Sequence, residues 1–165
     1  MKKILVFLLL LTLYASAAIS IGDKAPNFTL KTLDGKHSHT LQSLKGNVVL
    51  INLWASWCKG CKKEMPEFFE LQKCYKKGFK IVTISVDDSA TKSQKLLNHL
   101  EKKTGTKTPF ITLYDAKKNV AKAYHCAAMP SSYLIDKNGV IKQIIVGSLD
   151  ANDIKKLKVE INKLK

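Results

Sequence analysis

Residues 54–61 read Trp54-Ala55-Ser56-Trp57-Cys58-Lys59-Gly60-Cys61, and they directly follow the apolar run Val48–Leu53. A near-continuous apolar run of this length is typical of a strand buried on both faces of a sheet. Beyond the second cysteine, apolar residues recur at helical spacing from Met65 to Tyr75. The two cysteines therefore stand where a buried strand passes into a helix, with Cys58 at the start of that helix.

A Cys-x-x-Cys pair in this position has a specific chemistry. The free N–H groups and the dipole at a helix N-terminus stabilise a thiolate, which is the nucleophile in thiol–disulfide exchange. We therefore expect Cys58 to attack a disulfide and Cys61, one turn later, to resolve the mixed disulfide. Lys59 would add positive charge beside the thiolate, and Gly60 would let the turn form without side-chain obstruction.

The same two cysteines are also half of a zinc site. A copper or zinc carrier that uses Cys58 and Cys61 is thus an alternative function. The sequence contains no second Cys-x-x-Cys and no His-x-x-x-His half, so redox chemistry is favoured over metal binding. We expect no metal and no cofactor beyond a redox-active Cys58–Cys61 disulfide.

The remaining patterns predict strands that alternate with helices. An Asp34-Gly35 turn predicts an opening hairpin, and an Asn138-Gly139 turn predicts a later one. Between and after them we expect a strand, a helix capped by Ser89, a short strand and a terminal helix, over 79–86, 89–103, 110–114 and 150–165. This order is typical of an α/β fold with a mixed sheet and helices on both faces.

The first 17 residues have the layout of a secretory signal peptide. Lys2 and Lys3 precede the apolar run Ile4–Leu13, and Ala15-Ser16-Ala17 is a small-x-small cleavage pattern. The apolar run is shorter than the roughly 20 residues of a membrane-spanning helix, so an uncleaved N-terminal anchor is the less favoured alternative. We expect 18–165 to form the mature domain in the periplasm or another extracytoplasmic space, where cysteine pairs can perform redox work.

The charge and composition of the chain limit which classes of binding partner are expected. The chain has 165 residues and a net charge of +15, and it contains no arginine. Lysine supplies only point charges, whereas bidentate contacts to guanine favour arginine, so nucleic acid is not an expected partner. Four cysteines are too few for a disulfide scaffold, and the length suits one domain, which we expect to be a monomer.

Three blocks of sequence resemble the thioredoxin superfamily, in its exported TlpA/ResA-like branch of thiol–disulfide oxidoreductases. They are residues 21–30 with 34–36, residues 52–66 and residues 129–139. The first block is shared with peroxiredoxin relatives, and the central block is the most specific. The resemblance implies a thioredoxin fold with an N-terminal β-hairpin extension and an insertion after the second core strand–helix unit.

The resemblance also implies roles for residues around the cysteines. Pro130 matches the family's cis proline, and Met129 takes the position whose backbone pairs with the substrate chain. Trp57 and Pro130 would flank the reacting sulfur. Glu64 matches a glutamate that tunes the protonation of the cysteines and would relay a proton to or from Cys61. The alternative for Glu64 is a first-turn glutamate favoured by the helix dipole.

The function implied is an exported thiol–disulfide oxidoreductase that reduces or exchanges protein disulfides. The clients implied include the haem-site cysteines of apocytochrome c, and a membrane thiol reductase would supply the electrons. A disulfide oxidant or isomerase is the enzymatic alternative. A peroxidase is disfavoured, because the sequence shows no lone peroxidatic cysteine in the required surroundings.

Two further cysteines go beyond the family pattern. Cys74, one turn past Leu71, is expected to be a small core residue. Cys126 stands where the family usually has an aliphatic residue, and three alternatives remain: a buried side chain, a bond to Cys74, or a third thiol near the redox site. A metal site formed by His125 with Cys58 and Cys61 is disfavoured, since neighbouring residues point different ways along a strand.

Overall fold

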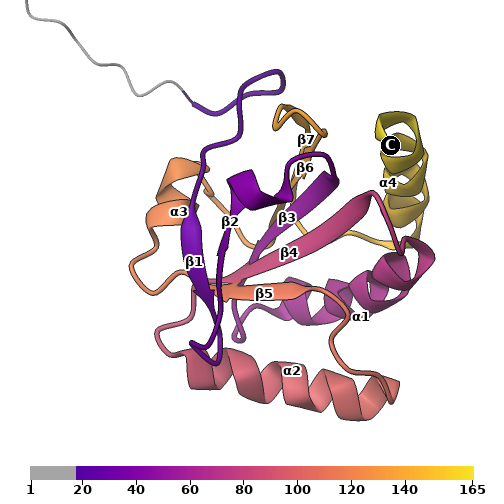
Figure 1. Cartoon of the computed structure of the whole chain (residues 1–165). Helices are drawn as coiled ribbons and strands as arrows, with labels where there is room; N and C mark the ends of the chain where they lie inside the picture. Colours follow the sequence, from indigo (N-terminus) through magenta and orange to yellow (C-terminus); the bar gives the residue numbers. More distant parts are fainter. Residues whose placement is uncertain (1–17) are drawn as a thin grey trace, which may run out of the picture.

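A seven-stranded mixed sheet organises the chain (Figure 1). The computed structural model describes residues 18–165, and the signal peptide predicted for residues 1–17 lies outside them. The strand order is β2-β1-β5-β4-β3-β6-β7. The strands are β1 Thr29–Thr32, β2 Ser38–Thr40, β3 Val48–Trp54, β4 Phe79–Ser85, β5 Ile111–Tyr114, β6 Ser131–Ile135 and β7 Ile141–Val146.

The centre of the sheet is parallel and its two sides are antiparallel. β3, β4 and β5 run parallel, whereas β6 pairs antiparallel to β3 and β1 pairs antiparallel to β5. Every residue of β3 is buried, which is the burial expected of a central strand covered on both faces. The apolar run Val48–Leu53 is therefore the middle of the core.

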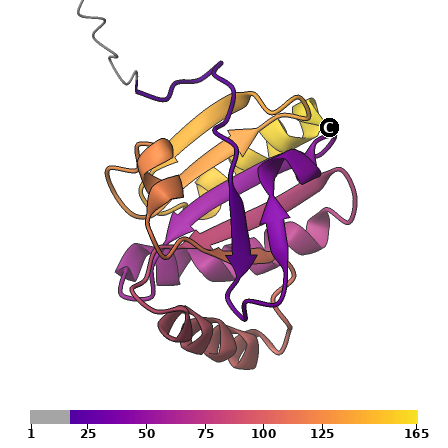
Figure 2. The same ribbon diagram turned by 60° about the vertical axis from the view of Figure 1, so that its left-hand side comes forward.

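The helices cover both faces of the sheet. They are α1 Lys59–Cys74, α2 Ala90–Thr104, α3 Asn119–Ala123 and α4 Ala151–Leu164, with a short 3-10 helix η1 at Leu41–Leu44. The crossovers β3–α1–β4 and β4–α2–β5 move in the same direction across the sheet, so right-handed connections put α1 and α2 on one face. α4 packs against α1, and α3 lies on the other side of the strands (Figures 1 and 2).

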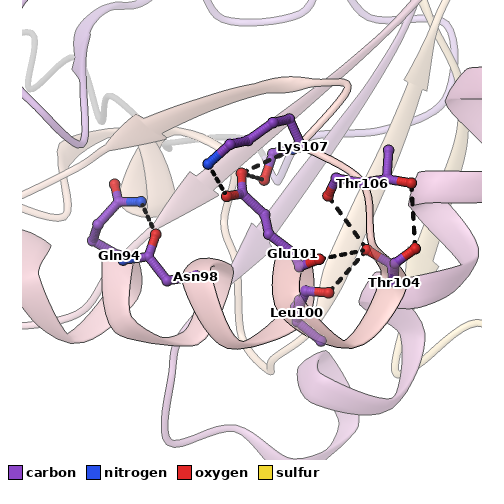
Figure 3. A network of polar contacts seen from close by, with 8 residues as sticks. Gln94, Asn98, Leu100, Glu101, Thr104, Thr106 and Lys107 are labelled. Atoms are coloured by element: carbon purple, nitrogen blue, oxygen red, sulfur yellow. Dashed lines mark hydrogen bonds and ion pairs between the residues drawn. The ribbon is translucent and has the colours of Figure 1, made fainter.

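Local signals set both ends of α2. The Ser89 hydroxyl accepts a hydrogen bond from the backbone N–H two residues later, and Gly105 ends the helix in the left-handed region with φ of 64°. Near this end, Glu101 accepts hydrogen bonds of 2.9 Å from the Lys107 ammonium and from the Thr108 N–H (Figure 3). These contacts tie the turn after α2 to the chain that enters β5.

The predicted fold class is confirmed. Both predicted hairpins form, as β1–β2 and β6–β7, and the sheet has helices on both faces. The N-terminal hairpin extends the sheet beyond β5, and β5 with α3 follows the second strand–helix unit, where the insertion was expected. Within residues 18–165, no helix has the length and hydropathy needed to cross a bilayer.

Candidate active site

The two cysteines of the motif lie at the N-terminus of α1. Cys58 is the N-cap residue, and its Sγ accepts a hydrogen bond of 3.1 Å from the Cys61 N–H. The two sulfurs form a disulfide, with 5.3 Å between the Cα atoms. Cys58 is 6% exposed, whereas Cys61 is 0% exposed. Cys58 is thus the cysteine of the pair that a second protein can reach.

Pro130 lies directly against the turn that carries the cysteines. The Met129–Pro130 peptide bond is cis, as the resemblance implied. A Cβ atom added to Gly60 would lie 3.2 Å from Cδ of Pro130, a contact tighter than ordinary van der Waals packing. Glycine at position 60 therefore allows the proline ring to approach the Cys-x-x-Cys turn closely.

Trp57 and Met129 lie on the surface around the disulfide. The Trp57 side chain is 68% exposed, which is unusual for a large apolar residue next to a core segment. Met129 lies two residues before Ser131, the first paired residue of β6. No hydrogen bond found among residues 18–165 uses the backbone N–H or C=O of Met129. Its backbone is therefore free to pair with another chain.

Glu64, three residues after Cys61 on α1, is buried in the core. Its Oε1 accepts a hydrogen bond of 2.9 Å from the Asn52 side-chain amide, and its Oε2 accepts one of 2.9 Å from the Leu149 N–H. Burial nevertheless raises the pKa of the Glu64 carboxyl to about 7, because the loss of water outweighs these two hydrogen bonds. The first-turn interpretation of Glu64 is wrong, since α1 begins at Lys59 and has no acidic residue in its first turn.

Asp87 is a site residue that sequence reasoning missed. Its buried carboxylate accepts hydrogen bonds of 3.0 Å from both the backbone N–H and the hydroxyl of Ser56, in the loop that precedes Cys58. The Ser93 hydroxyl of α2 donates a further hydrogen bond of 2.6 Å. Asp87 follows β4 at its carboxyl end, where functional groups of open α/β sheets gather, and that position was the available signal.

A groove of about 450 Å³ is lined in part by Trp57, the residue before Cys58. Trp57, Val86, Cys126 and Met129 line it together with residues of α3 and its flanks, so we call it the α3 groove. Cys126 is a half-buried free thiol that donates a hydrogen bond of 3.2 Å to the Ala128 carbonyl, and burial raises its pKa. Of the three alternatives for Cys126, the bond to Cys74 is wrong, and the half-buried thiol lines the same groove as Trp57 and Met129.

The prediction for Cys74 is wrong. Its side chain is exposed, and it forms no bond with Cys126. Leu71 lies at one edge of the buried stripe of α1, so a further step of three residues carries Cys74 outside that stripe. At this end of α1 the buried residue is Tyr75, which directly follows Cys74.

His125 and Cys126 were expected on a strand, but the structure does not place them on one. They lie in the loop after α3, where His125 has a left-handed φ of 48°. Within residues 18–165, no three His, Cys, Asp or Glu side chains are grouped so that they could hold a metal ion. The structure thus describes a disulfide, a buried carboxyl group three residues later on the same helix, and a groove lined by the residue that precedes Cys58.

Comparison with known proteins assigns this arrangement to a family. Residues 21–144 match the AhpC/TSA family. The chain belongs to that family. It is 36% identical over 140 residues to the thiol-disulfide oxidoreductase ResA of Geobacillus kaustophilus, covering 84% of this chain and 76% of that protein. It is 37% identical over 136 residues to the thioredoxin-like protein YneN of Bacillus subtilis, covering 82% and 77%.

A solved structure agrees with these relatives. The crystal structure from Chlorobium tepidum described as a thiol:disulfide interchange protein DsbE matches with a TM-score of 0.78 and 31% identity, covering 89% of this chain and 99% of that one. The predicted thioredoxin fold is therefore confirmed. Family, fold and the Cys58–Cys61 disulfide together identify the chain as a thioredoxin-like thiol–disulfide oxidoreductase.

Proposed function

We propose that this protein reduces disulfides in exported client proteins, with Cys58 as the nucleophile and Cys61 as the resolving cysteine. The observation that carries the proposal is the asymmetry of the pair. Cys58 is at the helix N-cap and is partly accessible to solvent, whereas Cys61 is fully buried. A helix N-terminus favours the thiolate form of the reduced Cys58, and burial protects Cys61 from reacting first.

The reaction proceeds in two exchanges. The Cys58 thiolate attacks one sulfur of the client disulfide, and the other client sulfur leaves as a thiolate that takes up a proton. The Cys61 thiol then loses its proton and attacks the Cys58 sulfur, which releases the second client thiolate. The client gains two electrons, and the protein ends with the Cys58–Cys61 disulfide.

In this scheme Glu64 accepts the proton that Cys61 must lose. The two residues are three positions apart on α1, so they share one face of the helix. A carboxyl group with a pKa of about 7 exchanges protons readily at neutral pH, which suits a general base. The hydrogen bonds from Asn52 and Leu149 hold the carboxylate in place while it acts.

The client chain docks beside Pro130. Its backbone pairs with the free N–H and C=O of Met129, as an added strand would. Trp57, mostly exposed next to Cys58, packs against the client on the other side of the reacting sulfur. Cytochrome c maturation fits this scheme, with the haem-site cysteines of apocytochrome c as clients.

The proposal places the enzyme outside the cytoplasm. Cleavage after residue 17 would release residues 18–165 into the periplasm or an equivalent space, where protein disulfides form. A reductant there needs a source of electrons, and a membrane thiol reductase that draws on the cytoplasm would re-reduce the Cys58–Cys61 disulfide.

Trapping of mixed disulfides tests the mechanism. A Cys61→Ser variant expressed in its own compartment should accumulate adducts with client proteins, which mass spectrometry would identify. A Cys58→Ser/Cys61→Ser variant is the control and should form none. Adducts that persist in the double variant, or no thiol-sensitive adducts in the single variant, would contradict the assignment of Cys58.

The reduction potential tests the direction. Equilibration with glutathione or dithiothreitol should give a potential near that of thioredoxin, about −270 mV, rather than near the oxidant value of about −120 mV. A value near the latter would make the protein a disulfide oxidant.

A further inference from the structure

Two lysines are among the residues that line the α3 groove. Lys118, the N-cap residue of α3, and Lys122, in its last turn, line the groove together with the exposed His125. No Asp or Glu in the described part of the chain contributes to that lining. The lining itself therefore contributes positive charge and no carboxylate.

These lysines are available to a ligand. Lys118 contacts Asp88 at 3.5 Å, but both side chains are at least half exposed, so solvent weakens this pair. Lys122 is exposed and forms no ion pair with any residue in 18–165. Two exposed ammonium groups thus line the groove with little of their charge compensated.

Most of the other residues that line the groove are apolar, and two of them are close in sequence to the redox motif and the cis proline. Trp57 directly precedes Cys58 in the chain, and the half-buried Met129 directly precedes Pro130. A segment in the groove would thus place an apolar side chain against Trp57 and Met129. At the same time, its next residues would pass under Lys118 and Lys122.

We propose that the α3 groove selects client segments that carry an aspartate or glutamate within about two residues of the reactive cysteine. This inference rests on the proposed function and names the class of client that the same site prefers. Ammonium groups attract carboxylates without fixing their geometry, so lysine suits a site that must accept many sequences. The net charge of +15 adds long-range attraction of the same sign.

Matched peptides test the selection. Three linear peptides would each carry one cysteine, joined by a disulfide to the neutral thiol 2-mercaptoethanol. They would differ only in having Asp, Asn or Lys at the two positions on either side of the cysteine. Stopped-flow mixing with the reduced full-length protein at low salt gives the rate constants, and each is divided by the rate with dithiothreitol to remove intrinsic reactivity.

The expected result is that the Asp peptide reacts about tenfold faster than the Lys peptide, and that salt reduces this ratio. In a Lys118→Gln/Lys122→Gln variant the ratio should fall below about twofold, while the rate with the neutral Asn peptide stays unchanged. A Lys102→Gln/Lys103→Gln variant removes two exposed charges from the last turn of α2 and should keep the full ratio.

Two results would overturn the inference and leave the proposed function intact. One is equal normalised rates for the Asp and Lys peptides. The other is an equal loss of the ratio in both lysine variants, which would assign the preference to overall charge. If the reduced protein left all three peptides unreacted, the proposed function would fail, and the inference would fail with it.

Discussion

Oε2 of Glu64, in α1, accepts a 2.9 Å hydrogen bond from the backbone N–H of Leu149, which lies 85 positions later and directly before the α4 cap. The bond links the helix that carries the cysteines to the segment that leads into the terminal helix. Burial raises the pKa of the Glu64 carboxyl to about 7, although this hydrogen bond acts to lower it.

Stability should depend on pH through Glu64. Folding raises the pKa of the carboxyl group from 4.5 to about 7. Between pH 4.5 and pH 7, the folded state therefore keeps a proton that the unfolded state has released. The contribution of Glu64 to the free energy of unfolding should be highest below about pH 4.5 and fall by about 3 kcal/mol as the pH rises to 7. Urea denaturation of the wild type and of a Glu64→Gln variant at pH 4.5 and 8 measures this, and equal pH dependence in the two would contradict it.

The resolving step should depend on the same group. When a Cys58 mixed disulfide is formed and its release is timed, the wild-type rate should rise through about pH 7 as the Glu64 carboxylate becomes available. Glu64→Gln should slow release about 100-fold at pH 8 and remove that inflection. Glu67→Gln, on the same helix, should match the wild type. An unchanged profile in Glu64→Gln would exclude Glu64 as the proton acceptor.

Removal of Asp87 should disturb the loop before Cys58. Asp87→Ala leaves the Ser56 N–H and the Ser85 and Ser93 hydroxyls without their buried acceptor, and we expect a loss of about 3 kcal/mol in unfolding free energy. The neighbouring Asp88 is exposed, and Asp88→Ala should change stability by less than about 0.5 kcal/mol. Denaturant titration of both variants provides the comparison. Similar losses of unfolding free energy in the two variants would contradict the stabilising role of the buried hydrogen bonds of Asp87.

A tyrosine pair should hold α3 against the sheet. The Tyr133 hydroxyl donates a 2.8 Å hydrogen bond to the Tyr124 carbonyl at the end of α3, and the Tyr124 hydroxyl donates one of 2.8 Å to the Pro26 carbonyl. Tyr133→Phe should therefore cost about 1–2 kcal/mol, since a buried carbonyl loses its donor. Tyr114→Phe is the matched control, because no hydrogen bond to the Tyr114 hydroxyl is found in residues 18–165. Thermal unfolding should show a lower Tm for the first variant alone.

Predictions that depended on short spacings agree with the structure. Cys58 and Cys61 lie at a strand-to-helix junction, Ser89 caps α2, and both turn signals form hairpins. Each of these features is decided within a few residues, by hydrogen bonds and backbone preferences that the residue types themselves carry.

Predictions about isolated side chains were less successful. The helical spacing from Leu71 predicted that Cys74 lies in the core, but Cys74 lies on a solvent-exposed face of the helix. Asp87 was missed because its partners, Ser56 and Ser93, come from separate segments that only the packing of β3, β4 and α2 brings together. The interpretation of Glu64 likewise depended on where α1 begins.

By itself, the amino-acid sequence determined which two cysteines pair, where they lie on the helix and which order of strands and helices surrounds them. Only the tertiary structure decided that Cys61 is fully buried, that burial raises the pKa of the Glu64 carboxyl to about 7 and that Lys118, Lys122 and Trp57 line one groove. The physical reason is distance along the chain. Burial and charge at a site depend on segments tens of residues apart, and local residue patterns carry no record of how those segments meet.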